Sequence, residues 1–227
     1  MDDIFKWLKE LFGAAKKSSD EISDLIKLSE ELVQATRSRI LIQKSNKLEE
    51  LYNAAEAANK ELKITTTDFA KETKGEAGFR DGLKSRERSL EKIESDYVGD
   101  ASRLVDIAGS KVVYESVEEL YIALNRFNKE YKILKIKDRI QKPLNGYRDV
   151  LMNIEMKNGH IVEFRLHIKA MDEAADVGHK IYEQRRTLEA KSSQRKLTVR
   201  EKELIETLTL KEKELYDSAW NKIIKNK

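Results

Sequence analysis

Two stretches in the second half of the chain carry apolar residues at every second position. They cover residues 150–156 and 162–168 and are joined by Lys157-Asn158-Gly159. Because successive side chains of a strand point to opposite faces of the sheet, this alternation predicts two strands that each bury one face. Asn-Gly is a strong signal for a tight turn between antiparallel strands. The pattern therefore predicts a β-hairpin over residues 150–168.

The polar positions of the second predicted strand are Glu163, Arg165 and His167. A period of two places all three on the face opposite the buried apolar residues. A carboxylate, a guanidinium and an imidazole in one row are unusual on a plain solvent-facing surface, so we expect a functional site on this face. His160, just after the turn, is expected to be exposed.

Helical periodicity accounts for most of the remaining chain. Apolar residues recur at helical spacing over residues 4–12, 18–33, 48–62, 88–97, 117–127, 171–190 and 198–223. Ser18, Ser116 and Thr198 each precede a glutamate by three residues, which is the spacing of a capping box at a helix N-terminus. The segment 4–12 is amphipathic, and it is expected to pack on its own chain, to bind a partner or to lie on a membrane surface.

Between the helices, residues 112–114 and 131–136 are expected to be strands on either side of one helix. This order predicts a split βαβ unit. The β-branched residues 65–67 are expected to end the third helix. The glycines at 75, 78 and 82 are expected to form a loose junction, and the polar run 185–196 a solvated helix end or linker.

The amino-acid composition excludes several classes of function. The 227 residues carry 44 Lys and Arg against 41 Asp and Glu, a balance that argues against a chain built mainly to coat nucleic acid. The absence of cysteine excludes disulfides, thiolate metal sites and cysteine nucleophiles, and three histidines argue against a multi-histidine metal centre. The single proline indicates a chain made mostly of regular structure.

Targeting signals are missing from the sequence. No apolar run approaches the roughly 18–20 residues that a transmembrane helix needs. The N-terminus Met1-Asp2-Asp3 lacks the basic region of a secretory signal peptide. A cytoplasmic protein is expected, or one exported by a route that needs no cleaved signal.

Two carboxylates and one basic loop are the candidates for chemistry. Asp106 precedes one predicted strand and Glu163 lies on another, so they can hold a hard cation such as Mg²⁺. The loop at 137–148 contains four cations, an Asn-Gly turn and Tyr147, which suit phosphate and a nucleobase. These residues suggest Mg²⁺-dependent nucleotide chemistry, and the alternative is a solvated basic loop with two surface carboxylates.

Five segments within about residues 79–186, roughly half the chain, occur in an order that resembles a known family. The segments are Leu83-Lys84-Ser85-Arg86-Glu87 with Lys92-Ile93, Asp106-Ile107-Ala108-Gly109-Ser110-Lys111-Val112, Lys137-Asp138-Arg139-Ile140 with Asn145-Gly146-Tyr147-Arg148, Val162-Glu163-Phe164-Arg165-Leu166-His167, and Gly178-His179 with Tyr182. This set resembles the synthetase domain of the RelA/SpoT-type alarmone synthetases, as a divergent small member that carries only the synthetase.

The resemblance implies a fold and a domain plan. It implies an α+β nucleotidyltransferase-like fold, a mixed β-sheet flanked by helices, with helical extensions at both ends. The expected division is a helical extension over residues 1–75, a synthetase domain over 76–190 and a C-terminal helix over 191–227. The N-terminal helices are expected to serve a homo-oligomer, autoinhibition or an antitoxin-like partner.

The resemblance also implies an activity and a role for each site residue. Pyrophosphate would pass from ATP to the 3′-hydroxyl of GDP or GTP, giving (p)ppGpp and AMP. Asp106 and Glu163 would hold Mg²⁺, and Glu163 would also act as the general base. The residues expected to bind ATP are Arg80, Lys84, Lys92 and Lys111. Those expected to bind the acceptor are Lys137, Asn145, Tyr147, Arg148, Arg165 and His167, with Tyr147 stacking on the base.

Several positions depart from the family pattern. Gly82 stands where the family usually has an arginine, and Lys111 ends the aspartate motif in place of an arginine. Leu144 replaces a lysine, while Arg165 and His167 replace a glutamine and an arginine. These departures leave the acceptor less defined than ATP.

Three functions are therefore compared below. The first is a small (p)ppGpp synthetase. The second is a growth-inhibiting toxin that uses the same chemistry on adenosine nucleotides or on a tRNA 3′ end. The third is a degenerate module that binds a nucleotide or a partner without turnover.

Overall fold

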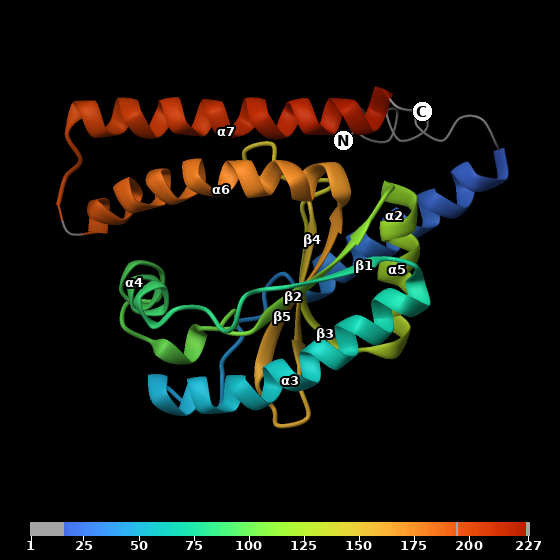
Figure 1. Ribbon diagram of the computed structural model, residues 1–227, viewed down its shortest axis with the longest axis horizontal. Coiled ribbons are helices and arrows are strands. Elements are labelled where there is room, and N and C mark those ends of the chain that lie inside the picture. The colour runs from blue at the N-terminus through green and yellow to red at the C-terminus, as the bar shows by residue number, and fades with distance from the viewer. Residues whose placement is uncertain (1–15, 194, 226–227) are drawn as a thin grey trace.

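The computed structural model describes residues 16–193 and 195–225 (Figure 1). Within these residues a five-stranded mixed sheet has the strand order β1-β2-β5-β4-β3. The strands are β1 (Glu76–Phe79), β2 (Gly109–Tyr114), β3 (Ile133–Asp138), β4 (Val150–Glu155) and β5 (Ile161–Ile168). The helices are α2 (Lys16–Thr36), α3 (Leu48–Thr73), α4 (Arg86–Asp96), α5 (Val117–Glu130), α6 (Lys169–Ala190) and α7 (Val199–Lys225), with short 3₁₀ turns at Ala101–Arg103 and Lys191–Ser193. The predicted α+β fold, a mixed sheet flanked by helices, is confirmed.

The centre of the sheet is the predicted hairpin. β4 and β5 are antiparallel, and β5 pairs in parallel with β2, so that Glu163 lies opposite Gly109. β3 pairs antiparallel with β4 at the edge. The split βαβ unit is confirmed as well, since β2, α5 and β3 enclose the inserted pair β5 and β4. The capping box at Ser116 is present, with Glu119 bonding back to the backbone of Ser116.

The hydrophobic core fills one face of the sheet. Phe69 of α3 meets Phe127 of α5 with ring centroids 5.1 Å apart, and Phe127 stacks on Phe164 of β5 at 4.5 Å. Ile22 and Ile26 of α2 belong to the same buried cluster. Because Phe164 points toward α3 and α5, its neighbours Glu163 and Arg165 lie on the other face. The proposed division into three domains remains a prediction.

Three local predictions were wrong. α3 does not end at the threonines but runs to Thr73, because the hydroxyls of Thr66 and Thr67 donate to carbonyl oxygens four residues back. The glycine-rich junction contains the strand β1, antiparallel to β2. A Cβ at Gly78 would lie 2.7 Å from the Lys111 side chain, so glycine lets β1 approach β2 here. The helix α2 is already formed at Lys16, so Ser18 is not its cap.

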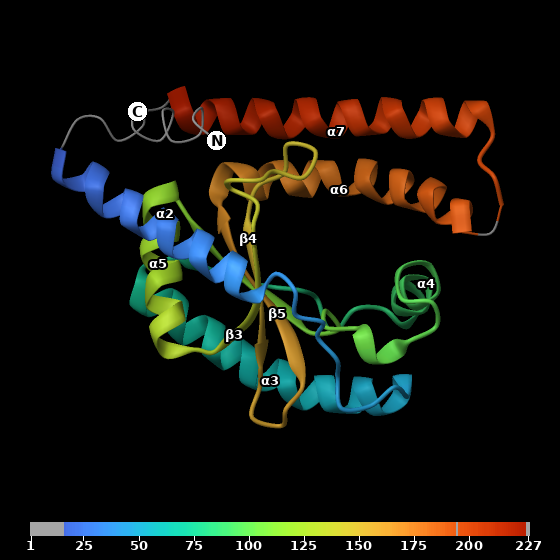
Figure 2. The same cartoon turned by 180° about the vertical axis from the view of Figure 1, so that it is seen from behind.

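The last two helices lie side by side on the side of the molecule away from α3 (Figures 1 and 2). Arg185 of α6, expected to be solvated, is 8% exposed because its guanidinium binds Glu212 of α7 at 2.9 Å. Thr198 and Glu201 exchange the predicted capping hydrogen bonds before α7. In the described residues no helix is long and apolar enough to cross a membrane. The segment 4–12 lies outside the described residues.

The outer edge of β3 is covered by the segment that follows α2. The Arg39 guanidinium donates to the carbonyl oxygens of Ile133 and Leu134, and Lys135 donates to the Arg39 carbonyl oxygen at 2.7 Å. The Thr36 hydroxyl accepts the backbone N–H of Ile136 at 3.3 Å. This edge strand therefore has side-chain partners for several of its backbone groups.

His160 is buried, contrary to expectation, and this predicts a pH effect. The side chain is 3% exposed beside Gln43, and burial lowers its pKa to about 4. As pH falls from about 6.5 toward 4, the unfolded chain takes up a proton that the folded chain does not, so stability falls with decreasing pH. We expect a loss of about 2 kcal/mol between pH 7 and pH 4.5. Urea unfolding at both pH values should show this loss in the wild type and a smaller one in His160→Gln. An equal loss in both proteins would contradict it.

Candidate functional site

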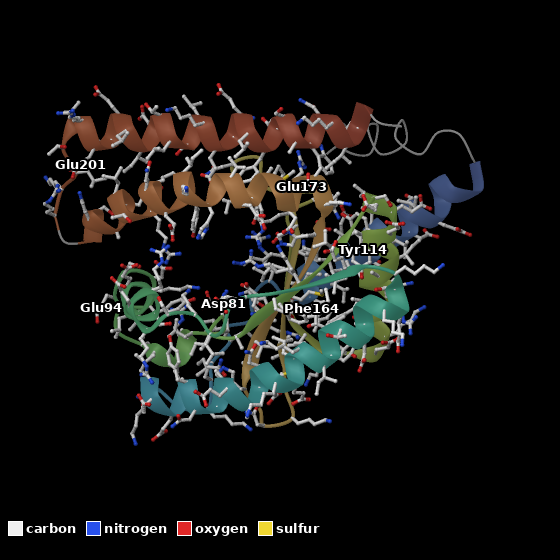
Figure 3. The ribbon with its side chains drawn as sticks, in the orientation of Figure 1. Asp81, Glu94, Tyr114, Phe164, Glu173 and Glu201 are labelled. Atoms are coloured by element: carbon white, nitrogen blue, oxygen red, sulfur yellow. The ribbon has the colours of Figure 1, made fainter. Side chains whose placement is uncertain are left out.

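Polar side chains gather on the sheet face opposite the aromatic core. Arg165 of β5 lies between Lys111 of β2 and Leu151 of β4, and Lys137 of β3 continues the same row. In Figure 3, nitrogen-tipped side chains occupy the region between the sheet and α6, while Phe164 lies on the sheet near α3. The expectation that Glu163, Arg165 and His167 share one face is confirmed by the pairing register.

Three of the predicted ATP-binding residues meet at Asp106, in the loop before β2. Lys84 and Lys92 each place Nζ 2.8 Å from the same oxygen, Asp106 Oδ2. Arg80 donates from Nη1 to the backbone carbonyl oxygens of Asp106 and Ile107 at 3.0 and 3.2 Å. Two ammonium groups thus share a single carboxylate, and a guanidinium is held at the backbone of the same loop, which leaves an excess of positive charge.

Burial and pairing compete in this cluster. Burial alone would raise the pKa of Asp106, but the ammonium groups of Lys92 and Lys84 outweigh it and hold this pKa well below its usual range. Burial opposes the charged form of Lys92 too, yet Asp106 raises its pKa. For Lys84 burial prevails and the pKa is lowered. Both lysines are largely buried and aimed at one point, an arrangement suited to a polyanion.

Lys111, the fourth predicted ATP residue, has a different partner. Its ammonium group binds both oxygens of Asp172, in the first turn of α6, at 2.5 and 2.7 Å. His167 Nδ1 lies 3.0 Å from Asp172 Oδ1. Lysine in place of the family arginine is therefore accommodated by an acidic residue that the sequence analysis did not single out.

Glu163 is adjacent to the Asp106 loop. Its backbone N–H donates to the Ala108 carbonyl oxygen at 3.1 Å, two residues after Asp106. Its Oε1 accepts from Arg165, with Nε at 2.8 Å and Nη2 at 2.7 Å. Burial would lower the pKa of Arg165, but Glu163, Tyr147 and Asp149 raise it, so the guanidinium stays charged. Within the described residues only Oε1 of Glu163 receives hydrogen bonds, which leaves Oε2 for other ligands.

Asp149 organises the acceptor side of the site. It is fully buried, binds Arg139 through two oxygens at 2.5 and 2.8 Å, and accepts from the Tyr147 hydroxyl at 3.1 Å. The Tyr147 hydroxyl is also 3.2 Å from His167 Nε2. Burial and the nearby Asp149 raise the pKa of Tyr147, so its hydroxyl stays protonated. Arg139 lies over the Tyr147 ring, 5.2 Å from its centroid.

The other residues predicted to bind the acceptor lie at the border of this network. Asn145 and Gly146 both adopt positive φ, 49° and 82°, and form the predicted tight turn. Arg148 points to α7, where its guanidinium lies 4.4 Å from the centre of the Trp220 ring. Lys137 lies at the end of the row with Arg165, where partial burial of its ammonium group together with Arg139 lowers its pKa. The structure therefore brings Tyr147, Arg165 and His167 together and directs Arg148 elsewhere.

Asp149 and Asp172 were missed by sequence reasoning. Asp149 stands two residues before Leu151, so it continues the polar-face alternation of β4 back toward the loop. That position was a usable signal, because residues opposite His167 on the neighbouring strand share its face. For Asp172 the sequence offers no such signal, since the approach of α6 to β2 is a long-range contact.

A divalent cation fits this site only if the phosphates of a bound nucleotide supply some of its ligands. In the described part of the chain no group of three His, Asp or Glu residues could hold a metal ion. Asp106 Oδ1, however, is buried without a hydrogen-bond partner. Mg²⁺ is commonly bound by one or two carboxylates together with substrate phosphates. Asp106 and Glu163 match that requirement, and the phosphates would complete the site.

Loss of the Asp149 charge should destabilise the fold. Asp149→Asn keeps the size of the side chain but leaves Arg139 buried without a carboxylate, which typically costs about 3 kcal/mol or more. Chemical denaturation should show this decrease in the free energy of unfolding. Asp176→Asn, at an exposed position of α6, is the matched control and should change it by less than about 0.5 kcal/mol. Equal stability of the two variants would contradict the role given to Asp149.

Comparisons with known proteins agree with this architecture. Residues 81–187 match the family described as "Region found in RelA / SpoT proteins". The (p)ppApp synthetase toxin Tas1 of Pseudomonas aeruginosa (strain UCBPP-PA14) is 27% identical over 172 residues, which cover 64% of this chain and 38% of Tas1. The chain thus spans well under half the length of this relative.

Solved structures share the fold. The Type VI effector Tas1, crystallised with its immunity protein, superposes with a TM-score of 0.55 at 24% identity, covering 76% of this chain and 96% of that one. Small alarmone synthetase 1 from Bacillus subtilis gives a TM-score of 0.55 at 19% identity, covering 79% and 93%. Residues 81–187 therefore match the RelA/SpoT family, and the chain has the fold of the small alarmone synthetases.

Proposed function

We propose that this chain transfers the pyrophosphate group of ATP to the 3′-hydroxyl of a purine nucleotide and releases AMP. The observation that carries the proposal is the cluster in which Lys84 and Lys92 converge on Asp106 beside Glu163. An excess of buried cations next to two carboxylates suits a triphosphate and a divalent cation together. The match of residues 81–187 to the RelA/SpoT family supports this reaction.

On the donor side, Lys84, Lys92 and Arg80 would bind the ATP phosphates. Stabilisation of charge on the transferred group is the main source of rate in phosphoryl transfer, and these residues are held in place before ATP arrives. Asp106 and Glu163 would hold Mg²⁺, which would neutralise phosphate oxygens. The role of Lys111 in this proposal is indirect, because Asp172 already occupies its ammonium group.

Glu163 would act as the general base. Arg165 fixes Oε1, so Oε2 is the atom that would accept the proton of the 3′-hydroxyl. The acceptor oxygen then forms a bond to the β-phosphorus of ATP, the bond from this phosphorus to the bridging oxygen of the α-phosphate breaks, and AMP leaves with that oxygen. Electrons and protons balance without another reactant.

The acceptor side would bind the second nucleotide through Tyr147, Arg165, His167, Lys137 and Asn145. The match to the RelA/SpoT family favours a guanosine nucleotide, so that (p)ppGpp is the first proposed product. A second acceptor, an adenosine nucleotide, is favoured by a specific finding, the 27% identity with a (p)ppApp synthetase toxin. Under this alternative the chain would act as a toxin, and an inhibitory partner comparable to the immunity protein of Tas1 becomes a further proposal.

The test is product analysis with purified protein, Mg²⁺ and ATP labelled in the β-phosphate. GDP, GTP, ADP and bulk tRNA are offered separately, and AMP release and the labelled product are measured. Label on a guanosine nucleotide supports the first proposal, while label on ADP or tRNA supports the toxin alternative. Folded protein that releases no AMP with any acceptor would contradict both and leave a non-catalytic binding module.

A further inference from the structure

The C-terminal helix α7 lies against the turn that is proposed to bind the acceptor. A Cβ at Gly146 would lie 3.0 Å from Asp217 Oδ1, 3.1 Å from the Lys213 carbonyl oxygen and 3.2 Å from Tyr216 Cβ. Gly146 also has a φ of 82°, which other residues adopt only with strain. Two features therefore favour glycine at position 146, the positive φ of the turn and the close approach of α7.

Tyr216 is wedged between this turn and α6. Its ring centroid lies 5.2 Å from that of Tyr147, with the ring planes 64° apart. On its other side it fills a notch at Gly178, where a Cβ would lie 2.5 Å from the Tyr216 hydroxyl oxygen and 3.0 Å from Cζ. The ring is 4% exposed. Tyr216 thus transmits the position of α6 and α7 to the ring of Tyr147.

The placement of α7 is itself fixed by buried polar contacts. Arg185 and Glu212, both nearly buried, join α6 to α7 at 2.9 Å. Trp220, one turn beyond Tyr216, packs under the Arg148 guanidinium. α7 begins at Val199, beyond the residues 81–187 that match the RelA/SpoT family, so this support for Tyr147 lies outside the matched region.

We propose that Tyr216 is a positioning residue for the acceptor, which holds the ring of Tyr147 in the orientation that a nucleobase stacks on. The proposal rests on the role given to Tyr147 under the proposed function. The Arg139 guanidinium lies over the Tyr147 ring, and the Tyr147 hydroxyl donates to Asp149. The contact with Tyr216 adds a further restraint on the orientation of the Tyr147 ring. A ring fixed before binding does not have to be ordered by the ligand, and this preorganisation strengthens binding.

Tyr216→Ala is expected to weaken acceptor binding roughly three- to tenfold, the equivalent of one aromatic pair. The dissociation constants of GDP and ADP are measured by calorimetry without ATP, and that of ATP separately. The ATP constant should stay within a factor of two, because Lys84, Lys92 and Asp106 do not contact α7. In the transfer assay the KM for the acceptor should rise more than kcat falls. Tyr216→Phe keeps the ring, so its acceptor dissociation constants and its acceptor KM should be close to those of the wild type.

A control and an independent variant separate positioning from stability. Leu208→Ala removes another buried side chain of α7, 6% exposed, and should lower the melting temperature without changing acceptor affinity. Gly178→Ala places a methyl group against the Tyr216 hydroxyl without altering either tyrosine, and should weaken acceptor binding like Tyr216→Ala. Adding Tyr216→Phe to Gly178→Ala removes the hydroxyl and should restore part of the affinity.

Two results would overturn the inference. One is an unchanged acceptor dissociation constant in folded Tyr216→Ala, and the other is a wild-type protein that binds neither GDP nor ADP. Failure of the transfer reaction alone is a separate result, because calorimetry reports acceptor binding without turnover. A protein that releases no AMP but loses acceptor affinity in Tyr216→Ala and in Gly178→Ala would support the inference and contradict the proposed function.

Discussion

Glu163→Gln is expected to lower AMP release by about 10³-fold or more while the protein stays folded. Glutamine has the same size and still offers an oxygen to Arg165, so the hydrogen bond at Oε1 can persist. It cannot accept the proton of the acceptor hydroxyl, a contribution that is typically worth about 10²–10⁴ in rate. It is also a weaker ligand for Mg²⁺ than a carboxylate. The measurement is the initial rate of AMP formation at saturating ATP and acceptor.

Glu155→Gln is the matched control, since Glu155 is an exposed glutamate on the neighbouring strand β4. It should leave the rate within a factor of two. Nucleotide binding by Glu163→Gln, measured by calorimetry without Mg²⁺, should remain close to that of the wild type. A variant that retains more than a tenth of the wild-type rate would rule out Glu163 as the general base.

Deletion of residues 1–63 is expected to abolish folding. The deletion removes Ile22, Ile26, Leu51 and Leu62, each 2% exposed or less. Burial of four such side chains contributes about 6–12 kcal/mol, which is as large as the whole stability of a typical domain. It would also expose the apolar residues of β2 and β5 that α3 covers. Circular dichroism should show no cooperative melting transition for residues 64–227.

Deletion of residues 1–15 is the control, because it removes none of the described helices. It should leave a cooperative transition in place. If residues 64–227 melted cooperatively and released AMP, the N-terminal helices would be a separable extension rather than part of the core. Loss of folding would mean that any regulatory role of α2 and α3 cannot be read from this truncation.

Local signals in the sequence predicted the parts of the fold that short segments determine. The hairpin at 150–168 follows from apolar residues at every second position and from Asn-Gly, and α5 follows from an apolar face with a capping box at Ser116. Glu163 was recognisable as a candidate because it is a charged residue within a predicted strand, and Asp106 because it is a carboxylate just before another strand. The order of the motifs indicated the resemblance to the RelA/SpoT family, which residues 81–187 match, and spacing alone could not.

The missed features depend on contacts between segments far apart in the chain. Thr66 continues α3 because its hydroxyl meets both the Leu62 carbonyl and Ser110, 44 residues away. His160 is buried because Gln43 packs beside it, 117 residues away in sequence. Neither contact can be recognised from the pattern of apolar and polar residues in its own segment. Arg148 belongs to the motif predicted to bind the acceptor, yet its guanidinium packs on the Trp220 ring of α7.

The covered edge of β3 sets a limit on self-association. Two sheets that join edge to edge form a continuous larger sheet, and the process can repeat only if each chain offers two open edges. Here Arg39 and Thr36 bind backbone groups of β3 at one end of the strand order, and the Lys135 side chain holds the backbone of Arg39 in place. Strand addition is therefore restricted to the side of β1, where one further chain could join. This architecture permits a pair of molecules through their sheets and blocks growth of a fibre from them.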